Sequence, residues 1–185
     1  YWRDWSSDVC SSDLALMRLL AQKSGWTAQA DVVVIGSGVA GLTTALQIRS
    51  HNLSVMLVTK SSVDEGSTKW AQGGIAAALG PGDSPAQHER DTLVAGAGLC
   101  DLPAVKVLVS EGPEAVRKLI ARGAVFDRSE TGEIALTREG GHLRNRILHA
   151  GGDATGAEVS RALLAAVSQD PGIEVIEHAL VLDAL

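Results

Sequence analysis

Two runs of consecutive branched apolar residues stand out from the mixed pattern of the chain. Residues 32–35 read Val-Val-Val-Ile, and residues 54–59 read Ser-Val-Met-Leu-Val-Thr. Unbroken runs of this length are typical of strands that are buried on both faces of a parallel sheet. The intervening residues 39–50 predict a helix, so the three segments together predict a βαβ unit.

The apolar spacing also predicts helices in the middle of the chain. Residues 103–110 and 113–122 are expected to form two separate helices, each with a proline in its first turn, where the missing N–H does no harm. Gly123 is expected to end the second helix in a left-handed conformation. The pair Val125-Phe126 is expected to begin a short strand.

Near the end of the chain, the pattern predicts one clear amphipathic helix over residues 153–169, with Asp153 or Thr155 as its N-cap. The apolar residues of this helix recur at i, i+4 and i+8: Val159, Leu163 and Val167. Residues 173–177 and 180–182 then predict two further strands.

Composition limits the class of protein. The chain has 185 residues, of which 45% are hydrophobic and 21% are charged, as expected for an ordinary globular domain. A net charge of −6, with no cluster of Lys or Arg, argues against a nucleic-acid partner. No apolar stretch approaches the ~20 residues needed to span a bilayer. Cys10 and Cys100 form neither a disulfide framework nor a metal motif, so no metal and a cytoplasmic location are expected.

The ends of the chain differ from its middle. Residues 1–14 lack a usable apolar period and resemble translated vector sequence, so we exclude them as a probable non-native leader. Residues 15–30 form a weakly patterned lead-in. The sequence stops at Leu185 without a terminating element, as if cut within a domain.

Three glycines directly follow the first predicted strand. Gly36, Gly38 and Gly41 have the GxGxxG spacing and open the predicted helix. The first glycine allows a tight turn, the second allows the backbone to approach a pyrophosphate, and the third allows close packing of helix and strand. This context predicts a dinucleotide site on the helix N-terminus. The alternative is a glycine-rich turn without a ligand.

The second predicted strand ends without the expected acid. In NAD enzymes an Asp or Glu at this point binds the ribose 2′-OH. Here the corresponding positions are Val58, Thr59 and Lys60, which disfavours a plain NAD site. Lys60 could instead contact a phosphate or a ribose hydroxyl.

Two later segments are candidates for a binding site. Residues 64–78 are rich in glycine and small hydroxyl residues, which suits a backbone close to a flat ligand, although a simple turn is the alternative. Residues 137–153 mix glycines with ionisable groups, so they predict either a site or a solvated loop. These groups are Arg138, Glu139, His142, Arg144, Arg146, His149 and Asp153. A histidine before glycines, as at position 149, is more often a structural hydrogen-bonder than a base.

Three stretches together resemble one protein family. VIGSGVAGLTTAL, EGSTKWAQGGIAAAL and LTREGGHLRNRILHAGGDATGAE are similar to the flavoprotein subunits of the succinate dehydrogenase/fumarate reductase superfamily, and within it to the L-aspartate oxidase branch. The resemblance covers residues 31–185. It implies an α/β, Rossmann-like FAD-binding domain with a parallel sheet and a large helical insertion at about residues 80–150, truncated at the C-terminus.

The resemblance implies one FAD in an extended form. Its pyrophosphate would lie over Gly36–Gly41, its isoalloxazine near Ser67–Gly74, and its adenine end near Leu180-Val181. Succinate dehydrogenases bind FAD covalently through a His at the position of Ser67, so non-covalent FAD is expected here. The implied contacts are Gly36, Ser37, Gly38, Val39, Ala40, Gly41, Lys60, Ser67, Thr68, Lys69, Trp70, Ala71, Gln72, Gly73, Gly74, Leu180 and Val181.

The resemblance also implies a substrate and a reaction. Glu139 would point into the substrate site and pair with the α-ammonium of L-aspartate, whereas the family's main catalytic His and Arg residues lie in later sequence. Hydride transfer from the substrate Cα to flavin N5 would give iminoaspartate, with oxygen or fumarate as electron acceptor. Quinolinate synthase would use this product on the route to NAD.

Two other functions remain open from the sequence. One is a soluble fumarate reductase or succinate-oxidising flavoprotein of the same superfamily. The other is a nucleotide-binding module that is inactive as this fragment.

Overall fold

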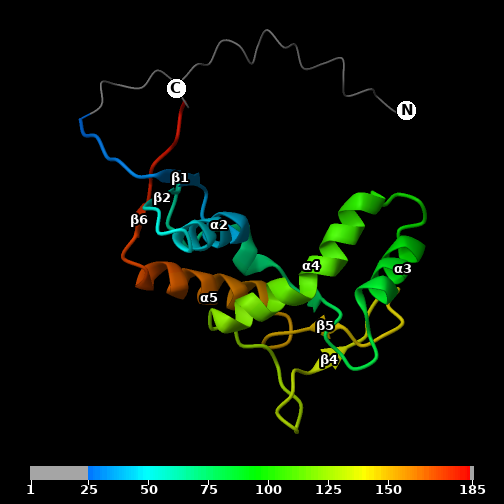
Figure 1. Ribbon diagram of the computed structural model, residues 1–185. Coiled ribbons are helices and arrows are strands. Elements are labelled where there is room, and N and C mark those ends of the chain that lie inside the picture. The colour runs from blue at the N-terminus through cyan, green and yellow to red at the C-terminus, as the bar shows by residue number, and fades with distance from the viewer. Residues whose placement is uncertain (1–24, 184–185) are drawn as a thin grey trace, which may run out of the picture.

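The computed structural model in Figure 1 describes residues 25–183. The predicted leader and most of the predicted lead-in lie outside these residues. In chain order, the elements are β1 (Val32–Ile35), α2 (Val39–Arg49), β2 (Val55–Val58), the 3-10 helix η1 (Ser67–Trp70), β3 (Ile75–Ala76), α3 (Pro85–Ala95), α4 (Leu102–Ala121), β4 (Leu136–Thr137), β5 (Ile147–Leu148), α5 (Thr155–Gln169) and β6 (Ile173–Ile176). No helix among them is long and apolar enough to cross a membrane.

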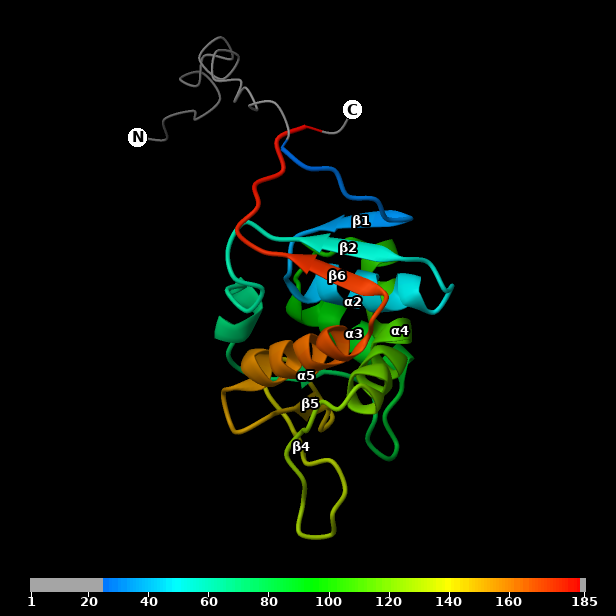
Figure 2. The same cartoon turned by 90° about the vertical axis from the view of Figure 1, so that its left-hand side faces the viewer.

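A parallel three-stranded sheet of order β1-β2-β6 forms one half of the fold. Helix α2 packs against β1 and β2, and α5 packs against α2 (Figure 2). The core between them is aliphatic, because Leu42, Leu57 and Leu163 are almost fully buried there. The predicted α/β class, the parallel sheet and the βαβ unit are confirmed.

The first strand is not buried on both faces as predicted. Val33 and Ile35 are 54% and 64% exposed, whereas all four residues of β2 are buried. Among the described residues β1 is an edge strand, and the helices cover only the face that carries Val34. The prediction of a strand at residues 180–182 is also wrong, because these residues pair with no strand.

Helix α4 runs unbroken through Pro113, so the prediction of two helices is wrong. Val109, Pro113 and Val116 are all buried on one face of α4, and this continuous packing offsets the hydrogen bond that the proline lacks. The helix begins at Asp101, whose carboxylate accepts the Ala104 N–H at 2.8 Å. Gly123 follows its end with φ +92°, as predicted.

A second, antiparallel sheet of order β3-β5-β4 lies below α5 in the view of Figure 2. Its core includes Leu148, Ala162 and Phe126. The pair Val125-Phe126 does not start a strand, although Phe126 is only 4% exposed. A single aromatic side chain therefore fills this core without joining the ladder.

Helix α5 has the predicted buried face, since Val159, Leu163 and Val167 are all at most 5% exposed. Its N-cap position is Ala154, so neither predicted cap is correct. The hydroxyl of Thr155 instead accepts the N–H of Ala150 at 3.2 Å, which ties the preceding loop to the helix.

Candidate functional site

A cleft of about 440 Å³ opens at the carboxyl ends of β1 and β2. Ligands of open parallel α/β sheets bind at this edge. The cleft is lined by Ile35, Gly36, Ser37, Gly38, Val58, Thr59, Lys60, Ser61, Glu65, Gly66, Ser67, Ala179, Leu180 and Val181. It therefore brings together residues of three segments that are far apart in sequence.

The glycine turn at the base of this cleft has the geometry that a pyrophosphate needs. Gly36 has φ +102°, which only glycine adopts without strain. A Cβ on Gly41 would lie 1.9 Å from the carbonyl oxygen of Gly36, so helix and turn meet at backbone contact. The N-cap of α2 is Gly38, which supplies no capping side chain, and the first turn holds no acid. The positive end of α2 therefore carries no acidic side chain that would repel an anion.

Two hydroxyl contacts fix the walls of the cleft. Ser37 Oγ lies 3.1 Å from Thr59 Oγ1, and this buried pair joins the glycine turn to the end of β2. The Val39 N–H donates to Thr68 Oγ1 at 3.1 Å, which joins the start of α2 to η1. Thr59 and Glu65 also line the cleft, but neither was predicted as a site residue. Nothing in the local sequence shows that these two side chains lie there.

Seven of the predicted FAD contacts meet in this cleft: Gly36, Ser37, Gly38, Lys60, Ser67, Leu180 and Val181. Five others line a smaller hollow of about 170 Å³ on the other side of η1: Thr68, Ala71, Gln72, Gly73 and Gly74. The rest line neither space: Val39, Ala40, Gly41, Lys69 and Trp70. Trp70 is 75% exposed, and Lys69 lies over its ring and near Asp64.

Gly156, at the start of α5, holds η1 in place. Its N–H donates to the Ala71 carbonyl at 3.0 Å, and a Cβ there would lie 2.1 Å from the Thr68 carbonyl oxygen. No side chain larger than hydrogen fits between α5 and η1. This contact was not predicted, because Gly156 and η1 are far apart in sequence.

His149 lies between Glu139 and Gly74, the second glycine of the pair Gly73-Gly74. Glu139 Oε1 is 2.8 Å from Nε2 of His149, and a Cβ on Gly74 would lie 3.0 Å from Cε1 of the same ring. The Glu139 side chain is 53% exposed, whereas that of His149 is 15% exposed. The two candidate segments of the sequence, residues 64–78 and 137–153, therefore meet in space.

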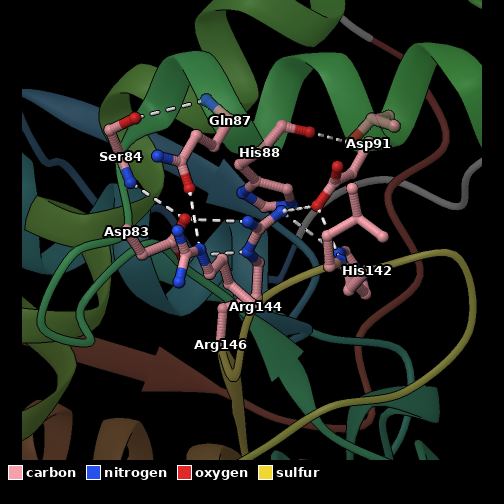
Figure 3. A network of polar contacts seen from close by, with 10 residues as sticks. Asp83, Ser84, Gln87, His88, Asp91, His142, Arg144 and Arg146 are labelled. Atoms are coloured by element: carbon pink, nitrogen blue, oxygen red, sulfur yellow. Dashed lines mark hydrogen bonds and ion pairs between the residues drawn. The ribbon is translucent and has the colours of Figure 1, made fainter.

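Part of the charged segment is buried rather than solvated, which corrects the solvated-loop alternative for that part. Arg146 has no exposed surface and binds the carboxylate of Asp83 with two nitrogens, at 2.8 and 2.9 Å (Figure 3). A third nitrogen lies 2.9 Å from Asp91 and 3.3 Å from Nδ1 of His142. Asp83 and Asp91 were not predicted, because they lie more than fifty residues before their partner.

The groups around Arg146 have shifted pKa values. The Leu143 N–H, and then the Arg146 charge, hold the pKa of Asp91 below its usual value. Burial, reinforced by Arg146 and His142, lowers the pKa of His88. The His88 ring lies 5.3 Å from that of His142, and its Nδ1 forms no hydrogen bond within the described residues. Together these groups anchor α3 to the segment that leads into β5.

The parallel sheet, the glycine turn and the cleft beside it define an α/β nucleotide-binding domain. Residues 31–184 match the family model described as an FAD binding domain, and the chain belongs to this family. Since the residues of the cleft supply a glycine turn beside the N-terminus of α2, they fit a dinucleotide such as FAD.

Comparisons with curated proteins show similarity to L-aspartate oxidases. The chain is 64% identical over 169 residues to the L-aspartate oxidase of Streptomyces coelicolor, covering 91% of this chain and 29% of that protein. It is 52% identical over 155 residues to the chloroplastic L-aspartate oxidase of Arabidopsis thaliana, covering 84% and 24%. The chain therefore spans less than a third of the length of these relatives.

Solved structures show a related fold. Mycobacterium smegmatis Sdh1 is 35% identical, with a TM-score of 0.73 over 80% of this chain and 27% of its own. E. coli quinol fumarate reductase is 29% identical, with a TM-score of 0.75 over 82% and 26%. The chain is thus similar in structure to these two proteins, and more similar in sequence to the L-aspartate oxidases.

Proposed function

We propose that this chain is the FAD-binding part of an L-aspartate oxidase. The observation that carries the proposal is the position of Glu139, an exposed carboxylate that lies beside Gly73-Gly74 through His149. A carboxylate at this point suits a substrate with a cationic amino group. The 64% identity to the Streptomyces coelicolor enzyme supports the same conclusion.

The cleft residues would hold FAD without a covalent bond. The turn at Gly36–Gly38 and the N-terminus of α2 would bind the pyrophosphate, and Leu180-Val181 would contact the adenine end. Ser67 has no imidazole with which to form the bond found in succinate dehydrogenases. When bound, FAD supplies the acceptor for the hydride that leaves the substrate, and the protein supplies position and charge.

The substrate site would select L-aspartate by charge. Glu139 would pair with the α-ammonium, which succinate lacks, so the wrong ligand would leave this carboxylate desolvated without a cation. Loss of hydride from Cα to the flavin, together with loss of protons from the ammonium group to solvent, would give iminoaspartate, with oxygen or fumarate as the final electron acceptor. Quinolinate synthase, in the cytoplasm, would be the consumer of this product. The other substrate-binding groups, which the resemblance implies in later sequence, would complete the site.

A second candidate is a fumarate reductase or succinate-oxidising flavoprotein. The structural similarity to E. coli quinol fumarate reductase, with a TM-score of 0.75, favours it. Ser67 disfavours the covalent members of that group, and Glu139 disfavours a substrate without an amino group. Without the later catalytic groups, the 185-residue chain alone would act only as a nucleotide-binding module.

The test uses the full-length gene product. Acid precipitation should release yellow flavin into the supernatant, and anaerobic L-aspartate should bleach the native protein whereas succinate should not. Bleaching by succinate alone would assign the protein to the dicarboxylate branch. Absence of flavin would contradict the proposal altogether. Aspartate-dependent peroxide from the isolated 185-residue chain would show that the catalytic groups lie within it.

A further inference from the structure

We infer that His149 is a positioning residue that holds Glu139 for the substrate ammonium group and so sets selectivity for an amino acid over a plain dicarboxylate. This inference rests on the proposed function and adds a residue to it. The contact that carries it is the 2.8 Å approach of His149 Nε2 to Glu139 Oε1. A carboxylate can only accept, so the ring nitrogen donates in this contact.

Two further groups lie close to the ring. The Gly152 carbonyl oxygen is 3.2 Å from Nδ1, and Thr137 Oγ1 is 3.1 Å from Nε2. Since Thr137 also donates to Glu139 Oε1 at 3.4 Å, the three side chains form one small network. Such an arrangement limits the rotamers of an exposed glutamate, which would otherwise sample several positions.

The backbone places this network at a fixed point. Thr137 is paired with Ile147 in the β4–β5 ladder, and His149 follows β5 directly. The fully buried Arg146 precedes β5 and ties it to Asp83 and Asp91. Glu139 is thus an exposed carboxylate next to the β4–β5 ladder, which the buried Arg146 ties to Asp83 and Asp91.

Only one oxygen of Glu139 is used by this network. Within the described residues Oε2 has no hydrogen-bond partner, while Oε1 is bound by His149 and Thr137. The free oxygen can therefore receive an ammonium hydrogen without breaking the support. His149 also contacts Gly74, so the same ring relates the carboxylate to the segment expected beside the flavin.

The experiment compares three histidine variants in the full-length gene product. His149→Leu removes the donor, and His149→Gln restores an amide N–H near the position of Nε2. His51→Leu changes an exposed histidine in the turn after α2, which forms no hydrogen bond with Glu139 or His149 within the described residues. We expect His149→Leu to raise the KM for L-aspartate about tenfold, with kcat changed about twofold or less, and His149→Gln to recover most of the loss. His51→Leu should behave like the wild type.

Equilibrium binding gives a readout independent of turnover. Anaerobic calorimetry with succinate, which lacks the ammonium group, should show an unchanged affinity in His149→Leu. Glu139→Gln should lose the same selectivity, and the double variant Glu139→Gln/His149→Leu should be no worse than Glu139→Gln alone. This non-additivity distinguishes positioning of Glu139 from a general structural role.

Each other result is decisive. Equal loss of affinity for both ligands, or additive effects in the double variant, would overturn the inference and leave the proposed function intact. An unchanged KM in His149→Leu would do the same. If the wild-type protein is not reduced by L-aspartate, the proposed function fails first, and the inference fails with it. If His149→Leu does not fold, a KM for His149→Gln that is about tenfold raised, with normal flavin content, would contradict the expected rescue.

Discussion

The glycine cleft and the Arg146 network are both polar regions, but they are built in opposite ways. The cleft is assembled mainly from backbone: a left-handed Gly36, the Gly41–Gly36 contact and the N-terminal end of α2. The network is assembled from buried side chains, with Arg146 between Asp83 and Asp91. The cleft presents an open glycine turn to a ligand, whereas the network satisfies its charges internally.

This difference indicates a division of roles. A site that binds an anion needs donors without partners, which only an open backbone turn provides at low cost. A guanidinium without exposed surface, whose three nitrogens all contact protein acceptors, is not accessible to a ligand. We therefore interpret the network as structural and the cleft as functional, and substitutions in the two regions should separate stability from flavin binding.

The largest expected effect is on stability, from Arg146→Met. This substitution leaves the carboxylates of Asp83 and Asp91 buried without their cation, and breaking such a pair costs roughly 3–5 kcal/mol. Urea unfolding of the full-length protein should show this loss. The matched control is Arg144→Met, because Arg144 is exposed and donates to Gln87 at the surface. Similar losses of unfolding free energy in both variants would show that the loss does not come from the buried ion pairs of Arg146.

The second effect is on the turn, from Gly41→Ala. A methyl group 1.9 Å from the Gly36 carbonyl oxygen forces α2 away from the turn, which should cost about 1–3 kcal/mol and release much of the flavin. Gly112→Ala is the control, since Gly112 lies inside α4 and a Cβ there would meet no atom within 4 Å outside its own helix backbone and chain neighbours. That variant should keep its flavin and change the free energy of unfolding by about 1 kcal/mol or less, because the helical gain of alanine is opposed by the following Pro113. Flavin content and unfolding free energy check both. Normal flavin in Gly41→Ala would contradict the proposed contact.

Local sequence predicted much of the cleft. The strand Val32–Ile35, the GxGxxG turn and α2 follow one another without interruption, so their geometry depends on residues that are close in the chain. Lys60 and Ser67 were also predicted, and both line the cleft. The resemblance to a family added Leu180-Val181, which no local pattern places there.

The rest depended on contacts between distant residues. Pro113 was expected to start a helix, because its local effect is to remove a hydrogen bond, but buried packing along α4 outweighs that loss. Arg146 was predicted to belong to either a site or a solvated loop, and its buried structural role was not foreseen, because a sequence does not show that two acids approach it from fifty or more residues away. The exposure of Ile35 depends on the neighbours of β1 in the sheet.

The third effect is a change in pH dependence, from His88→Phe. Burial lowers the pKa of His88 below its usual value of 6.5, so protons bind the unfolded chain first as the pH falls. Its contribution to stability is therefore complete above pH 6.5 and is lost as the pH drops toward the lowered pKa. One proton accounts for at most about 1.4 kcal/mol per pH unit.

Melting temperatures at about pH 7.5 and about pH 5.5 check this prediction. The wild-type protein should lose stability over this interval, and His88→Phe should flatten the loss. The control is His51→Phe, because His51 is exposed in the turn after α2. An unchanged slope in His88→Phe would show that other groups account for the acid sensitivity.

The smallest expected effect is on affinity alone, from Lys60→Met. Lys60 is exposed at the cleft, so its charge can attract a phosphate or a ribose hydroxyl but contributes little to folding. We expect the Kd for FAD, measured by reconstituting the apoprotein, to rise about three- to fivefold with an unchanged melting temperature. Lys69→Met is the matched control, since Lys69 lines neither hollow and lies 3.8 Å from Asp64. A loss of stability in Lys60→Met, or an equal loss of affinity in both variants, would mean that the open backbone of the cleft, and not this side chain, accounts for binding.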